Sequence, residues 1–512
     1  MTPKLRTTLL FILVFAAVFV GLYITHASLL ELPYYWDEAG YFIPAARDIY
    51  ADGSFIPHST LSNAHPPLVM TWIALAWKLC GFHIWVARTA MVAVAALALT
   101  GVFALAARVA NWRVGVGCVL LTAAYPVFFA QSTLAHLDMM VSALTIWALV
   151  FYLPASGEGE EDGKDLFKSH GTRRAMCIAL LALAALAKET AVMVPVVLCG
   201  WELLCWLLSK KEKLAALVCI ERRPAWWSLT LLVACVPLAL WFAYHRARTG
   251  YTLGNPEYFR YNVESTLNLA RILDTIWRRL GHVTFHMNLW VLTLAGLVAM
   301  FLKPRRDGET ERPRISVNVQ LLFLMLVLAH VCALSVVGGA VLARYMLPVL
   351  PLVILIWVST LWRRVPAWPL AVALICAAFV YRAEVNPSYS FPWEENLAYR
   401  DFILLHRDAA RFLDEKYTDA RVLTSWPATD ELRNSYYGYT PRALKVVPVE
   451  NFLPAELERA AARKSEYDVA FLYSSHGGLE LDEAARLLGG RVVFREERKG
   501  QWVAVVDVTA KP

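Results

Sequence analysis

The feature that most limits how this chain can fold is a succession of long apolar segments separated by polar loops. A helix that crosses the hydrocarbon core of a bilayer needs roughly 20 predominantly apolar residues. Because such segments recur and 58% of all residues are hydrophobic, the bulk of the chain is not an ordinary soluble domain. We therefore predict a polytopic α-helical membrane protein with about eleven transmembrane helices. They cover residues 8–24, 84–107, 114–131, 139–153, 175–187, 190–208, 226–244, 285–302, 317–337, 345–361 and 369–381.

The basic residues between these segments predict the orientation of the chain. Cytoplasmic loops carry an excess of Lys and Arg, and with a cytoplasmic N-terminus every inside loop is basic. These loops lie at 108–113, 164–174, 210–223, 303–314 and 363–364. One outside connection is also basic, which calls for another explanation such as an anionic ligand. It contains Arg246, Arg248, Arg260, Arg271, Arg278 and Arg279.

The first apolar segment also has the features of a secretory signal peptide, with Lys4 and Arg6 ahead of the apolar run. Because many further spans follow, we favour a retained signal anchor, and in either case residues from Tyr34 onward lie outside. The nine cysteines are scattered, mostly within apolar segments. No spacing among them indicates a zinc site or a disulfide framework.

The composition changes at about residue 383, which predicts two domains. Residues 1–382 form the membrane domain, whose first outer loop, 26–83, carries interfacial helices at 40–50 and 67–79 with Trp72 and Trp77 as membrane anchors. Residues 383–512 form a soluble extracytoplasmic α/β domain, with a helical period at 401–416 and strand-like patterns at 421–424, 468–473, 492–494 and 502–508. No Gly-rich phosphate loop follows these strands, so we assign this domain no catalysis. The run 157–165 is an acidic linker.

Charged and polar residues gather at the predicted outer ends of the helices. Asp37 and Glu38 are adjacent just after the first span, where a carboxylate is costly unless it has a function. A carboxylate at the mouth of a cavity can take a proton from an attacking hydroxyl, and cations at the same level can stabilise a departing phosphate. We therefore predict an extracytoplasmic catalytic cavity with Asp37 as the base. The further candidates are Glu38, His58, His65, Arg88, Asp138, Lys188, Glu189, Arg246, Arg248, His282, His286, Arg344 and Tyr345.

Each of these residues also has a simpler explanation. Lys188 or Arg344 can be a snorkelling residue at a helix end, Asp138 can be an N-cap, His65 can cap a helix, and His286 can be a satisfied interior histidine. Positively and negatively charged residues that gather at one membrane level around one loop are harder to explain in this way. Their gathering favours a functional site.

The sequence resembles the GT-C membrane glycosyltransferases, and more narrowly the group of protein O-mannosyltransferases and lipid A aminoarabinose transferases. The resemblance covers about residues 1–361 and rests on an ordered set of short motifs. These are Trp36-Asp37-Glu38-Ala39-Gly40-Tyr41, His65-Pro66-Pro67-Leu68, Trp85-Val86-Ala87-Arg88, Ala135-His136-Leu137-Asp138, Ala187-Lys188-Glu189 and Ala343-Arg344-Tyr345-Met346-Leu347-Pro348.

The resemblance implies an inverting transfer of a sugar from a polyprenyl-phosphate donor to a hydroxyl acceptor on the extracytoplasmic face of a bacterial inner membrane. In such enzymes the Asp of the first loop, here Asp37, is the proposed base, and Glu38 has a supporting role. The positions that bind the lipid-linked phosphate correspond to Arg88, Lys188, Arg344 and Tyr345. Asp138 matches a second acidic position with a binding or positional role.

The sequence departs from this group in two places. Ala64-His65-Pro66 stands where the aminoarabinose transferases carry Glu-Lys-Pro, so a lysine that contacts phosphate and a glutamate associated with zinc are absent. This puts lipid A in doubt as the acceptor, which can be a protein, a lipid or a glycan. The luminal MIR-type domain of eukaryotic mannosyltransferases is also absent. We expect no structural zinc, no cofactor and no nucleic-acid partner, and the need for a divalent metal stays open.

Two other functions remain possible on the sequence. A carboxylate with a nearby cation also suits a transporter or flippase of a lipid-linked sugar, although the centres of the predicted spans are almost free of charge. The chain can also be a non-catalytic membrane scaffold whose soluble domain binds cell-wall material.

Overall fold

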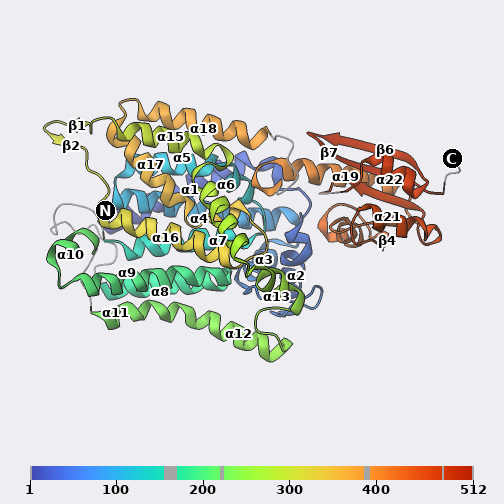
Figure 1. The fold of residues 1–512 in the computed structure, drawn as a ribbon, viewed down its shortest axis with the longest axis horizontal. Coiled ribbons are helices and arrows are strands. Elements are labelled where there is room, and N and C mark those ends of the chain that lie inside the picture. The colour runs from blue at the N-terminus through green and yellow to red at the C-terminus, as the bar shows by residue number, and fades with distance from the viewer. Residues whose placement is uncertain (1–2, 155–169, 220–223, 386–392, 476–477, 510–512) are drawn as a thin grey trace.

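Most of the chain forms a bundle of long helices, and the C-terminal residues form a small α/β domain at one end of it (Figure 1). The computed structural model describes residues 3–154, 170–219, 224–385, 393–475 and 478–509. The predicted acidic linker at 157–165 lies outside these residues. At the end of the bundle away from the α/β domain lie α10 (Glu212–Val218), the hairpin of β1 (Arg306–Asp307) and β2 (Thr310–Glu311), and the start of the described chain.

Each predicted membrane span overlaps a helix of the bundle. Among the described residues, seven helices are long and apolar enough to cross a bilayer, and three more are apolar but shorter. The count of about eleven spans therefore remains a prediction. The helices are α1 (Pro3–Thr25), α4 (Ile84–Val109), α5 (Trp112–Ala124), α6 (Pro126–Gln131), α7 (Leu137–Tyr152), α8 (His170–Ala187), α9 (Met193–Leu208), α11 (Ala225–Leu229), α12 (Val236–Thr249), α15 (Leu289–Met300), α16 (Val317–Val336), α17 (Leu350–Arg364) and α18 (Trp368–Glu384).

Helix α4 lies at the centre of the bundle and packs against α1, α5 and α7. Small residues allow these helices to approach closely, as is usual between helices in a membrane. At Gly101 of α4 an added Cβ would lie 3.0 Å from the Trp147 ring of α7, so the glycine makes room for this side chain. The Trp147 indole also donates to the Leu97 carbonyl at 2.9 Å, which satisfies its N–H inside the bundle.

The first outer loop contains two helices and a short π-helical turn. The turn, Glu38–Phe42, continues directly into α2 (Ile43–Asp52), and α3 (Leu68–Cys80) follows with Pro67 as its N-cap. Both helices were predicted. The prediction of Trp77 as a membrane anchor was wrong, because its ring is 1% exposed and packs against Tyr50 and Phe82. Trp72 is partly exposed.

The basic outside connection forms two helices, α13 (Pro256–Asn262) and α14 (Leu269–Thr284). Helix α14 exposes apolar residues such as Leu273 and Trp277, while Arg279 on its opposite side is fully buried. The chain breaks between α14 and α15 at Met287 and Asn288, which both have positive φ. The amphipathic pattern places part of the positive charge of this segment inside the protein.

The C-terminal domain combines a five-stranded sheet with helices, so the predicted α/β architecture is confirmed. The strand order is β4-β3-β5-β7-β6, with β3 parallel to β4 and β5, and β7 antiparallel to β5 and β6. The strand β4 was not predicted. The elements are α19 (Ala398–Lys416), β3 (Arg421–Thr424), α20 (Ala428–Arg433), β4 (Lys445–Pro448), α21 (Pro454–Ala461), β5 (Val469–Tyr473), α22 (Leu481–Leu488), β6 (Arg491–Arg498) and β7 (Gln501–Asp507).

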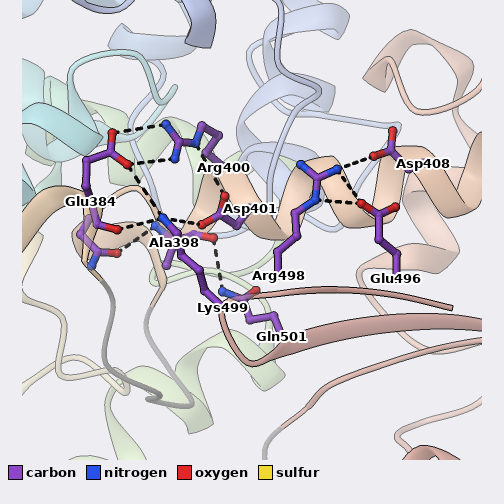
Figure 2. A network of polar contacts seen from close by, with 10 residues as sticks. Glu384, Ala398, Arg400, Asp401, Asp408, Glu496, Arg498, Lys499 and Gln501 are labelled. Atoms are coloured by element: carbon purple, nitrogen blue, oxygen red, sulfur yellow. Dashed lines mark hydrogen bonds and ion pairs between the residues drawn. The ribbon is translucent and has the colours of Figure 1, made fainter.

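A network of ion pairs joins this domain to the last helix of the bundle (Figure 2). Arg400 of α19 lies 3.1 Å from the Glu384 carboxylate at the end of α18. Lys499, in the turn between β6 and β7, donates to the Glu384 backbone carbonyl at 2.8 Å and lies 3.3 Å from Asp401. The predicted boundary at residues 382–383 falls in the last turn of α18, so the helix and the domain meet directly at this network.

Candidate active site

Two neighbouring carboxylates of the first outer loop point to different partners. The backbone at Trp36 has a φ of 47°, and Asp37 and Glu38 follow it. The Asp37 Oδ2 lies 2.5 Å from the Arg344 Nη2, and the Asp37 side chain remains 38% exposed. Glu38 instead is fully buried and pairs with Arg88. Of these two neighbouring carboxylates, Asp37 is therefore the one that an outside molecule can reach.

The Glu38–Arg88 pair is a buried structural link. Both Glu38 oxygens bind the Arg88 guanidinium, at 2.5 and 2.9 Å, and they also accept from the backbone N–H groups of Ala135 and Tyr35. The Arg88 Nη atoms further donate to the backbone carbonyls of Thr133 and Pro33. Both terminal nitrogens of Arg88 are thus bonded to oxygens of the protein, and its predicted role in phosphate binding remains a prediction.

Arg344 is 3% exposed and lies at the centre of a group of charged side chains, which we call the Arg344 cluster. Besides Asp37, it lies 3.1 Å from the Glu394 carboxylate and 3.5 Å from that of Asp138. Its Nη1 also lies 2.6 Å from the Nδ1 of His136. Burial and the nearby Arg344 charge hold the pKa of His136 well below its usual range, so the imidazole is neutral. The same Nδ1 also lies 2.7 Å from the Gln131 Oε1.

Positive groups surround the ring of Tyr345. Lys188 forms an ion pair with Asp138 at 2.7 Å, and its Nζ lies 3.9 Å from the centre of the Tyr345 ring. The guanidinium carbons of Arg279 and Arg344 each lie 5.5 Å from the same centre. Such contacts with the face of an aromatic ring are favourable for cations. They hold the positive charges of three separate segments together.

Arg279 has no carboxylate partner among the described residues. It is fully buried, its Nε and Nη1 have no hydrogen-bond partner, and its Nη2 has one long contact, 3.4 Å, with the Ala340 carbonyl. A buried cation that lacks a counter-charge is costly. An anion bound beside Tyr345 would supply this charge, so Arg279 marks the place where the cluster can accept a phosphate.

Two further candidates, His65 and Glu189, form a pair beside this cluster. The His65 Nδ1 lies 2.9 Å from the Glu189 carboxylate, and its Nε2 lies 3.5 Å from the Tyr258 hydroxyl. The Phe42 ring lies 5.9 Å from the His65 ring and 6.0 Å from the His136 ring. His65 and Glu189 therefore border the Arg344 cluster without contacting it directly.

The simpler explanations do not hold for several candidates. Lys188 and Arg344 are buried and paired, so they are not snorkelling residues. Asp138 is not an N-cap, because the N-cap residue of α7 is His136 and no side-chain hydrogen bond caps this helix. His65 bonds a carboxylate and does not cap α3, whose N-cap is Pro67.

The other candidates are outside the cluster or at its edge. His58 is largely exposed and pairs with Asp52 at 2.9 Å, while Arg246 and Arg248 are exposed in the last turn of α12. His286 pairs with Glu395 at 2.6 Å, and the His282 ring lies 5.1 Å from it. Within the described ranges, no group of three His, Cys, Asp or Glu residues has the arrangement of a metal site.

The sequence reasoning missed two carboxylates that complete the site. Glu394 and Glu395 belong to a short 3₁₀ turn, Trp393–Glu395, between α18 and the C-terminal domain, and both are buried. Glu395 accepts from the Ala343 N–H at 2.8 Å, next to Arg344. Asp37 was predicted from two adjacent acidic residues that follow a membrane span. The same pattern occurs at Glu394 and Glu395 and could have indicated them as site residues.

The C-terminal domain contacts the loop that carries Asp37. The Trp36 and Trp426 rings lie 4.7 Å apart, and the Tyr437 hydroxyl donates to the Ala39 carbonyl at 2.6 Å. The Tyr34 N–H donates to the Tyr437 carbonyl at 3.0 Å. These bonds fix the backbone on both sides of Asp37, so the domain is part of the frame that positions the site.

Comparisons with known proteins agree with this architecture. Residues 64–241 match the family model described as dolichyl-phosphate-mannose-protein mannosyltransferase. The structure of ArnT from Cupriavidus metallidurans bound to undecaprenyl phosphate is similar with a TM-score of 0.57 and 14% identity, over 96% of this chain and 97% of that chain. The same protein in its apo state gives a TM-score of 0.52 and 14% identity, over 97% and 99%.

The predicted helical membrane fold with a C-terminal sheet domain is therefore confirmed, and the chain shares the fold of ArnT over nearly its whole length. The archaeal oligosaccharyltransferase AglB from Archaeoglobus fulgidus, in complex with an inhibitory peptide and a dolichol-phosphate, is similar at a TM-score of 0.45 and 11% identity, over 96% of this chain and 74% of that chain. No curated protein sequence matches the chain.

Proposed function

We propose that this chain, which has the ArnT fold, is an inverting glycosyltransferase that moves a sugar from a polyprenyl-phosphate donor to a hydroxyl acceptor. The observation that carries the proposal is the Arg344 cluster. It combines one accessible carboxylate, Asp37, with the buried cations Arg344, Lys188 and Arg279. The matches to a mannosyltransferase family model and to a protein bound to undecaprenyl phosphate support a lipid-linked donor.

In the proposed reaction the carboxylate acts on the acceptor and the cations act on the donor phosphate. The acceptor hydroxyl attacks the anomeric carbon from the side opposite the phosphate, and the bond from that carbon to the phosphate oxygen breaks. Asp37 takes the hydroxyl proton as general base. Arg344, Lys188 and Arg279 stabilise the negative charge that returns to the lipid phosphate. The configuration at the anomeric carbon is inverted, because the attacking and departing oxygens lie on opposite sides.

Binding of the donor prepares Asp37 for this step. In the structure Asp37 is held by Arg344 at 2.5 Å, so the guanidinium occupies the carboxylate oxygen Oδ2. A donor phosphate beside Tyr345 competes for Arg344 and weakens its bond to Asp37. The carboxylate is then free to accept a proton from the acceptor.

We propose a positioning role for the Glu38–Arg88 pair. Glu38 accepts from the N–H of Tyr35, two residues before Asp37, and from that of Ala135, three residues before Asp138. The pair therefore joins the two segments that carry the acidic residues of the site. We propose the same kind of role for His65 and Glu189, since Glu189 directly follows Lys188.

We place the site on the extracytoplasmic face of a bacterial inner membrane, with a cytoplasmic N-terminus. The support is the position of the predicted basic loops, because α10 and the β1–β2 hairpin lie at the end of the bundle away from the C-terminal domain (Figure 1). We also propose that transfer needs no cofactor, because the cationic cluster itself supplies the charge that stabilises the phosphate. Transfer that occurs only after a cofactor is added to the purified protein would contradict this last point, and an assay with and without EDTA decides the open need for a divalent metal.

The direct test is transfer by the purified protein. Radiolabelled polyprenyl-phosphate sugars, including mannose and aminoarabinose, are incubated with candidate lipid, glycan and protein acceptors. We expect transfer of at least one sugar, and loss of about 10²–10⁴-fold in rate for Asp37→Asn. Asp52→Asn is a matched control in the same loop. Asp52 is exposed, and His58 is its only side-chain partner among the described residues, so this variant should transfer like the parent.

A flippase of lipid-linked sugars is the alternative that this experiment separates. Movement of the donor across a liposome membrane without transfer to any acceptor would support the flippase and contradict the proposal. A protein that neither transfers nor moves the donor would instead agree with a non-catalytic scaffold.

A further inference from the structure

A short 3₁₀ turn, Trp393–Glu395, lies in the active site just ahead of the C-terminal domain. Glu394 in this segment is 1% exposed. Its backbone carbonyl accepts from the Gln131 side chain at 3.0 Å, and the preceding Trp393 stacks on Phe402 of α19 at 4.7 Å. The position of Glu394 is therefore fixed from the bundle and from the domain.

Glu394 and Asp37 share one guanidinium. The Glu394 Oε1 lies 3.1 Å from the Nη1 of Arg344, while the Asp37 Oδ2 lies 2.5 Å from its Nη2. The contact with Arg344 is within ion-pair distance but lacks hydrogen-bond geometry, and both Glu394 carboxyl oxygens are buried without a hydrogen-bond partner. Glu394 is therefore close enough to attract Arg344 but does not hold it as Asp37 does.

We propose that Glu394 is a positioning residue that sets how much of the positive charge of Arg344 is available to the phosphate of the lipid-linked donor. This inference rests on the proposed function, and it adds a residue of the inter-domain segment to the machinery of the site. Glu394 acts through Arg344 and does not itself contact the reacting atoms.

The charged groups around Glu394 come from four segments. Arg344 faces it directly, and the negative charges nearest to it belong to Asp37, Asp138 and the adjacent Glu395. Burial raises the pKa of the Glu394 carboxyl to about 8, although the Arg344 charge opposes the rise. At pH 7 Glu394 is consequently protonated and neutral, and Arg344 keeps a net positive charge toward an incoming phosphate.

Ionisation of Glu394 reduces the positive charge that Arg344 presents to the phosphate. As the pH rises above about 8, the carboxyl loses its proton and becomes a third negative group beside Arg344. It then attracts the guanidinium through Nη1 and repels an anionic ligand. The donor should therefore bind more weakly at alkaline pH, and the change should follow the titration of a single group.

The test measures donor binding against pH by two readouts. One is the KM of the polyprenyl-phosphate sugar in the transfer assay, and the other is the Kd of undecaprenyl phosphate alone, both between pH 6.5 and pH 9.5. For one group with a pKa of about 8, the parent should lose affinity by roughly tenfold at pH 9. Glu394→Gln should bind as the parent does at pH 7 and stay level above pH 8, while Glu394→Asp should keep the alkaline loss.

The matched control is Glu395→Gln, which changes the neighbouring buried carboxylate but leaves Glu394 in place. It should keep the alkaline loss of affinity. A parent whose affinity does not change up to pH 9.5, or a Glu394→Gln variant that retains the loss, would overturn the inference. A merely structural Glu394 would change affinity equally at every pH. If undecaprenyl phosphate binds with the expected pH dependence but no sugar is transferred, the proposed function fails while the role of Glu394 stands.

Discussion

Breaking the buried pair between Glu38 and Arg88 should unfold the frame of the site as well as slow the reaction. Each Glu38 oxygen accepts from Arg88 and from one backbone N–H, those of Ala135 and Tyr35. In Glu38→Gln, an amide NH₂ replaces one oxygen and meets two donors that it cannot satisfy. The Arg88 charge is also left without its counter-ion at a site that is about 1% exposed.

The expected cost follows from this geometry. Removing one partner of a buried ion pair costs roughly 3–5 kcal/mol, because the other charge stays buried and uncompensated. Arg88→Met should cost a similar amount, since it also removes the donors to the Thr133 and Pro33 carbonyls. Because both variants break the same contact, the double variant should cost at least ~2 kcal/mol less than the sum of the single ones.

The assay combines thermal unfolding in detergent with the kinetics of the protein that remains folded. Both single variants should lower Tm by roughly 5–15 °C. A matched control is Glu202→Gln, which breaks the buried Arg174–Glu202 pair elsewhere in the bundle. This control should lower Tm but leave kcat of the folded protein unchanged, whereas the Glu38 and Arg88 variants should lower both.

A different result would refute the reasoning. If Arg88→Met keeps the parent's Tm and raises only the KM for the donor, Arg88 binds the phosphate directly and its pairing with Glu38 is not a structural link. Additive costs in the double variant would also contradict the pairing.

Three further predictions concern the surroundings of Arg344. Arg279→Gln should raise the donor KM by about tenfold or more with little change in Tm, because the Nε and Nη1 of Arg279 have no partner to lose. Trp426→Ala should lower kcat more than it changes the donor KM, since the ring supports the residue before Asp37; unchanged kcat would contradict this. Burial raises the pKa of Glu395, but the hydrogen bond with His286 outweighs burial and holds this pKa below its usual value. The ionised carboxylate therefore stabilises the folded state. Glu395→Gln should therefore be less stable than the parent above about pH 4.5, with the difference lost as the pH falls further, as measured by Tm at pH 7 and pH 4.

The helices of the bundle could be predicted because the bilayer imposes a length and a composition on every span. The strands β3 and β5 could be predicted because their runs of apolar residues are short and bounded by polar ones. The strand β4 was missed since Lys445–Pro448 is a short edge strand that ends in proline and has no buried residue. Its pattern does not differ from that of a loop.

The site was partly predictable for a related reason. Asp37, Asp138, Lys188 and Arg344 all lie at helix ends that the chain topology brings to one end of the bundle. Pairing is not visible in the sequence, because the choice between Arg88 and Arg344 as the partner of Asp37 depends on the backbone turn at Trp36.

The roles of Arg279 and Glu394 could not be predicted, because they depend on tertiary contacts. Arg279 lies on an amphipathic helix with Arg271 and Arg278, and only the packing of α14 shows which of these arginines is fully buried without a counter-charge. Glu394 follows the last span and was assigned to a domain for which no catalysis was expected. Its side chain reaches Arg344 because the 3₁₀ turn Trp393–Glu395 lies against the bundle, where the Gln131 side chain donates to the Glu394 carbonyl.

The most direct test of the central claim is the single-turnover rate of sugar transfer by Asp37→Asn with the donor already bound. The account predicts that donor affinity is kept or improved, since Arg344 is released to the phosphate, while the rate of transfer falls by about 10²–10⁴-fold. A variant that transfers as fast as the parent, with the donor bound equally well, would show that Asp37 is not the base.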